Sequence, residues 1–102
     1  MQETKVQFRE WLCDVVYRRY NNGRIAIQLL DYRDHEPVVV ATVNIPEEPL
    51  LPDEVIIKNY SENEGVIETL TNAGVISHPL RFVKTGYVEC PVCKLLTAPK
   101  NF

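Results

Sequence analysis

The residues most capable of chemistry are a pair of cysteines near the end of the chain, Cys90-Pro91-Val92-Cys93. A Cys-x-x-Cys pair occurs in half of a zinc site or in a thiol–disulfide couple. A structural zinc site needs four ligands, usually with a second close pair, and here the remaining candidates are single: Cys13, His35 and His78. Residues three apart in a strand point to opposite faces, so a strand here would separate the two thiols. We therefore expect no metal and no cofactor, and keep a metal or thiol protein using Cys90 and Cys93 as one alternative.

Motifs of known enzyme classes do not occur in the sequence. No GxSxG nucleophile motif, phosphate-binding glycine loop, dinucleotide-binding motif or HExxH motif is present. Glu62 and Glu64 could imitate a general acid/base pair, but helix capping explains both residues more simply. We expect a protein that is not an enzyme.

The best basic and aromatic cluster consists of Arg18-Arg19-Tyr20, together with Arg24 and Arg33. On a sheet such residues can stack on single-stranded nucleic acid and neutralise its phosphates. However, Arg18 and Arg19 would point to opposite faces of a strand. The net charge of −3 also argues against a general nucleic-acid binder, because that class is usually basic. A single-stranded nucleic-acid-binding protein using Arg18, Tyr20 and Arg24 is the second alternative.

Charge and composition set the protein class. The segment from Glu47 to Glu68 holds seven acids and one base, which could steer a basic partner. With 102 residues, 45% of them hydrophobic and 25% charged, the chain fits one soluble globular domain. The first residues contain no apolar run, so we expect no signal peptide and a cytoplasmic protein, without membrane contact. Whether it is a monomer or a homodimer stays open.

Residues 5–20 alternate between apolar and polar, with a change of phase at Arg9-Glu10. This pattern predicts a strand with a bulge or a break at that point. Phe8, Trp11, Leu12 and Val15 also fit a helical stripe, so one strand, a bulged strand and a helix all stay open.

Further strands follow from turn signals. Asn22-Gly23 favours a tight hairpin turn, and the prolines of 46–52 predict a surface connector. The tail, 97–102, is polar and is expected to be flexible. The predicted strands are Arg24–Asp31, Pro37–Ile45, Glu54–Asn59, and a hairpin of Leu80–Val83 with Tyr87–Leu96.

One helix is predicted, over about residues 62–73. Ser61-Glu62-Asn63-Glu64 reads as a capping box, and Val66, Leu70 and Ala73 share one helical face. Gly74 would end the helix. The resulting fold class is α+β, an antiparallel sheet of about five or six strands with one helix packed on one face.

Four stretches resemble an uncharacterised family of small bacterial proteins, domain-of-unknown-function family 4313. They are Asn22–Leu29, Ala41–Pro46, Ile57–Gly65 and Val92–Leu95, within roughly 17–96. Families of this kind are often carried by phages, plasmids and conjugative elements of gut bacteria, which implies an accessory role. The resemblance implies no catalytic residues. It also implies an apolar strand residue in place of Cys90, which would make the cysteine pair incidental.

The segment before the helix supplies the candidate binding residues Asn59, Tyr60, Asn63 and Glu64. A glycine at position 65 would cost stability in a helix, which close packing of a partner at the helix start could offset. The alternative is a junction that requires these residues for capping alone. We expect a non-catalytic protein–protein interaction module of a mobile element, whose partner the sequence does not identify.

Overall fold

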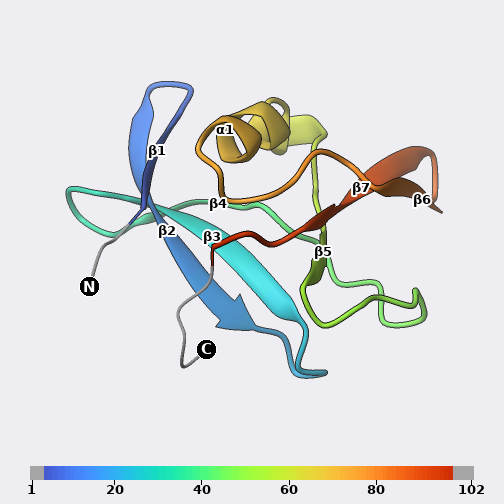
Figure 1. Cartoon of the computed structure of the whole chain (residues 1–102). Helices are drawn as coiled ribbons and strands as arrows, with labels where there is room; N and C mark the ends of the chain where they lie inside the picture. The colour runs from blue at the N-terminus through green and yellow to red at the C-terminus, as the bar shows by residue number, and fades with distance from the viewer. Residues whose placement is uncertain (1–3, 98–102) are drawn as a thin grey trace.

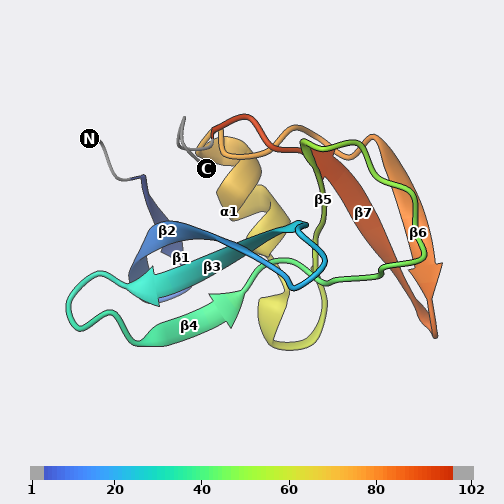
Figure 2. The ribbon, with the colours of Figure 1, turned by 90° about the horizontal axis from the view of Figure 1, so that it is seen from below.

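The computed structural model describes residues 4–97, and these residues form seven strands and one short α-helix, which confirms the α+β class. The prediction of one sheet with five or six strands is wrong. Two antiparallel sheets are present, with strand orders β1-β2-β3-β4 and β5-β7-β6 (Figures 1 and 2). The strands are β1 Lys5–Phe8, β2 Trp11–Arg19, β3 Ile25–Asp31, β4 Pro37–Val40, β5 Glu54–Ile56, β6 Arg81–Thr85 and β7 Val88–Lys94.

The first sheet is a meander joined by tight turns. The phase change at Arg9-Glu10 is a full break, because Phe8 pairs with Trp11 across a two-residue turn in which Arg9 has φ 54°. The hairpin predicted at Asn22-Gly23 is confirmed, with Gly23 at φ 86° between β2 and β3. The pairing of β3 with β4 shifts register between Leu29 and Leu30, where the extra residue Val38 lies in β4, and β4 ends at Val40 rather than residue 45.

The second sheet arises because the connector after β4 cannot extend the first one. Pro46, Pro49 and Pro52 have no backbone N–H to donate to a ladder. The chain therefore leaves the meander, and β5 pairs with β7 near the other end of the chain. A single bridge between Thr42 and Ile57 links the two regions.

The predicted helix 62–73 is wrong at its start. A short 3₁₀ turn, η1 (Ser61–Asn63), is followed by Gly65 at φ 94°, and the α-helix, α1, begins only at Val66 and ends at Asn72. The capping box does not form: the backbone N–H of Glu64 donates to the backbone carbonyl of Ser61 at 3.1 Å, and the N-cap residues are Tyr60 for η1 and Gly65 for α1. Gly74 follows the helix at φ 76°, as predicted for a stop signal.

Two clusters of buried side chains hold the layers together. The larger one joins α1, through Val66 and Leu70, to residues of both sheets. The smaller one lies on the opposite face of the second sheet and contains Ile56, Val83, Cys90 and Val92. The central strand β7 therefore contributes to both clusters and is buried on both faces.

Two expectations concern the chain as a whole. Within residues 4–97, no helix combines the length and the apolar character needed to cross a bilayer. Of the predicted tail, only Thr97 lies in the described part, where its hydroxyl is 2.8 Å from that of Tyr17. Residues 98–102 lie outside the described residues.

Candidate interaction surface

Two of the four residues predicted to bind a partner, Asn59 and Asn63, form hydrogen bonds within the fold. Asn63 is 1% exposed, and its Nδ2 donates to the Val40 carbonyl at 2.7 Å. The Oδ1 of Asn59 accepts the backbone N–H of Ile67 at 3.0 Å, which caps α1 in place of the predicted serine. The first amide thus anchors η1 to β4, and the second fixes the helix start.

The other two residues of this segment are more accessible. Tyr60 is partly buried against the smaller cluster, and the Lys58 ammonium lies 5.4 Å from the centroid of its ring. The side chain of Glu64 is exposed, while its backbone carbonyl accepts a bond from Arg9 at 3.2 Å. Glu64 is therefore the most accessible of the four residues, while Asn59 and Tyr60 are only partly exposed.

The three residues of the nucleic-acid alternative do not form one surface. The hydroxyl of Tyr20 is 2.8 Å from that of Thr42, and Arg24 donates to the carbonyls of Ile45 and Glu48. Both side chains therefore fasten the connector to the first sheet. Arg18 lines a different hollow from Arg24.

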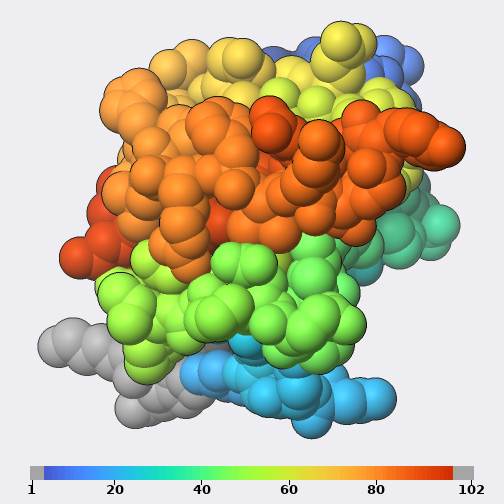
Figure 3. Space-filling model, turned by 90° about the vertical axis from the view of Figure 1, so that its right-hand side faces the viewer, coloured from blue at the N-terminus to red at the C-terminus, as the bar shows by residue number. Residues whose placement is uncertain are grey.

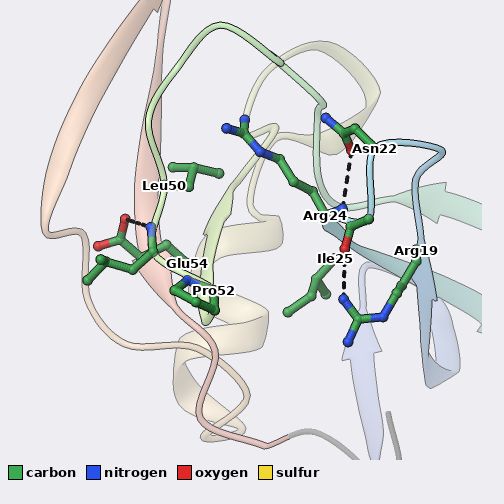
Figure 4. Close-up of a pocket in the computed structure, with 9 residues that line it drawn as sticks. Arg19, Asn22, Arg24, Ile25, Leu50, Pro52 and Glu54 are labelled. Carbon is green, nitrogen blue, oxygen red and sulfur yellow. Dashed lines mark hydrogen bonds between the residues drawn. The ribbon is translucent and has the colours of Figure 1, made fainter.

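Arg24 lies at a hollow of about 210 Å³ between the β2–β3 hairpin and the connector (Figure 4). Arg19 also lines it and donates to the Gly23 carbonyl at 2.7 Å, and Figure 4 shows the two arginines pointing in different directions. Glu54 on the opposite wall binds Arg81, with N···O distances of 3.1 and 3.2 Å. The bonds of Arg19 and Glu54 each stay on one side of the hollow, and only the bonds of Arg24 described above join the hairpin to the connector.

A second hollow of about 400 Å³ lies on the outer face of the first sheet and includes Asp14, Arg18 and His35. Asp14 is mostly buried, and its carboxylate lies 2.8 Å from the Lys5 ammonium and 3.7 Å from His35 Nε2. The nearest cation therefore balances the charge of Asp14, and no nucleophile is placed against His35 among the contacts of the described residues.

The cysteines are buried and separate. Cys90 belongs to the smaller cluster and Cys93 to the larger one, so the two thiols point to opposite faces of β7, as predicted. Burial raises the pKa of Cys93 to about 11, and burial with the nearby carboxylates of Asp31 and Asp14 does the same to the pKa of Cys13. Over residues 4–97, no group of three or more histidine, cysteine or acidic side chains could hold a metal.

The clearest exposed apolar surface lies on the β6–β7 hairpin. Leu80 is 55% exposed, Phe82 60% and Tyr87, at the hairpin tip, fully. Val83 points inward to the smaller cluster, so its neighbours Phe82 and Lys84 point to the other face. We call Leu80, Phe82, Lys84 and Tyr87 the β6 surface; the segment that carries it forms the orange band in Figure 3.

Backbone and charge set this surface apart. Among the described strands, β6 pairs with β7 alone and forms one edge of its sheet. Lys84 is exposed, and Glu89 of β7 lies opposite it in register, but within residues 4–97 no ion pair or hydrogen bond joins its ammonium to another group. By contrast, Arg81 on the same strand is held by Glu54 and by the Pro49 carbonyl.

Sequence reasoning predicted this hairpin but not its exposed surface. Leu80, Phe82 and Val83 are all apolar, so alternation alone does not show which face of the strand is covered. The burial of Val83 depends on Ile56, a residue far away in the sequence. The one available signal was the presence of apolar residues on both faces of a short strand.

In comparisons with known proteins, no protein-family model, no curated protein and no solved structure matches this chain.

Proposed function

We propose that this chain is a non-catalytic protein-interaction module and that it binds its partner through the β6 surface. The observation that carries the proposal is the concentration of Leu80, Phe82 and Tyr87 on one hairpin, all more than half exposed. Exposed apolar residues are normal when scattered, but a cluster of them is typical of an interaction site. Large aromatic residues also contribute much of the binding energy at protein interfaces.

The other candidate residues support this choice by their contacts. Asn59, Asn63, Tyr20 and Arg24 all bind within the fold, so a partner would have to break stabilising hydrogen bonds to engage them. The residues of the β6 surface need no such change. Phe82 and Tyr87 are already accessible, and the ammonium of Lys84 is available for a carboxylate.

The setting of this function is part of the proposal. The resemblance to the small bacterial family supports an accessory protein of a phage, plasmid or conjugative element. Three free cysteines, all buried, suit a reducing cytoplasm. The genes next to this one provide a direct test, since a block of phage or conjugation genes would support the setting and housekeeping genes would contradict it.

Affinity capture with matched variants tests the binding surface. The immobilised full chain, Phe82→Glu and the control Tyr32→Ser are exposed to extract from cells that carry the gene. Tyr32 is 45% exposed and lies in the turn that follows β3, next to the first sheet. We expect a partner retained by the wild type and the control, lost with Phe82→Glu, and confirmed with purified components. Equal capture by all three, or no reproducible partner, would contradict the proposal. Thermal unfolding of each variant checks that it is folded.

A further inference from the structure

We infer that β6 accepts the partner as an added β-strand, an extended segment of another protein with two alternating apolar residues and a carboxylate in register with Lys84. The inference rests on the proposed function, and it names how the partner binds and what chemistry its segment carries.

The backbone of β6 is the first argument. Its five residues pair with β7 on one side only, and Figure 2 places β6 at the outer margin of the molecule. An edge strand offers N–H and C=O groups along its open side, and extended peptides bind such edges by continuing the sheet. Main-chain bonding of this kind works for many sequences, so side chains must supply the selectivity.

Those side chains form an ordered row. Strand alternation puts Phe82 and Lys84 on one face of β6, and the exposed Leu80 directly precedes the strand, so the order along the chain is apolar, apolar, cation. Side chains directly opposite each other on neighbouring strands lie close enough to interact. A matching strand therefore carries apolar side chains beside Leu80 and Phe82, and an aspartate or glutamate beside Lys84.

The same row argues against pairing with a second copy. The sequence of β6, Arg81-Phe82-Val83-Lys84-Thr85, contains two cations and no acid. Two β6 strands placed side by side would give Lys84 no carboxylate from the facing strand. An acidic segment of a different protein satisfies both the charge and the apolar positions.

Peptide selection tests the chemical class. A phage-displayed library of random nonapeptides is selected on the immobilised full chain and on Lys84→Glu. The wild type should enrich acid–x–apolar–x–apolar or its reverse, whereas Lys84→Glu should enrich lysine or arginine at the acid position. A synthetic peptide from the first set should bind Lys84→Glu about fivefold or more weakly, and Phe82→Glu more weakly still. Identical preferences for both baits would overturn the assignment of a carboxylate.

Backbone methylation tests strand addition itself. Two versions of the selected peptide carry N-methyl groups on alternate amides, so that only one version blocks the amides facing β6. We expect binding to be lost in one version and kept in the other. Equal binding of both would overturn strand addition, and so would failure to select any peptide. In either case, a protein captured through Phe82 would still support the proposed function. If no peptide is selected and no protein is captured through Phe82, both the inference and the proposed function are overturned.

Discussion

Replacing Asn63 with alanine separates a structural role from a binding role at the start of the helix. The side chain is 1% exposed, and its Nδ2 donates to the carbonyl of Val40 at 2.7 Å. Asn63→Ala removes this donor and leaves the carbonyl without that bond. Losing one partner of such a bond costs about 1–3 kcal/mol.

A second atom reduces this cost. The Oδ1 of Asn63 is buried and has no hydrogen-bond partner among the described residues, so its removal lifts an unfavourable burial. We therefore expect a net loss of about 1–2 kcal/mol from the free energy of unfolding. For a domain of this size, that loss lowers Tm by roughly 4–16 °C.

Urea and thermal unfolding, followed by circular dichroism, measure the effect. The matched control is Glu64→Ala, which truncates an exposed side chain one residue later and should change stability by less than about 0.5 kcal/mol. Equal stability of Asn63→Ala and the wild type would refute the anchoring role, and would return Asn63 to the list of residues that serve a partner.

Three other perturbations test the account. Gly65→Ala should destabilise the fold by about 1–2 kcal/mol, because φ is 94° there; if residue 65 were in the helix, thermal unfolding would show a gain instead. Hydrogen bonds, first from Arg81 and then from the Leu51 N–H, lower the pKa of Glu54. The stabilisation from the ionised carboxylate is present above the ordinary pKa of glutamate and is lost as the pH falls through the lowered pKa. Glu54→Gln should therefore have a smaller free energy of unfolding than the wild type at pH 7. Urea titrations should show the gap closing in acid, and a gap that is constant with pH would count against the pairing. Finally, all three buried thiols should resist a thiol reagent in the native state and react in denaturant; fast labelling of any thiol in the native state would contradict its burial.

Local turn chemistry was readable from the sequence. Asn22-Gly23 predicted a hairpin because a tight turn needs positive φ, and Gly23 has φ 86°. The change of phase at Arg9-Glu10 predicted a bulge or a break, and the chain reverses there. The two thiols of the Cys-x-x-Cys pair separate because strand alternation leaves no other choice.

Features that depend on distant residues were not readable. The cap of α1 comes from Asn59, eight residues before the amide that it binds, so the nearby serine and glutamate gave a false signal. The second sheet depends on the pairing of β5 with β7, two strands that are separated in the chain by η1, α1 and β6. For the same reason the exposure of Phe82 could not be predicted, since tertiary packing alone decides which face of β6 is covered.

The most direct test of the central claim is amide hydrogen exchange of the full chain, with and without the captured partner. The account predicts that binding slows exchange within 81–85, the residues of β6, and leaves the amides of β2 and β3 unchanged. Protection at 59–64 or on the first sheet, with β6 unaffected, would contradict it.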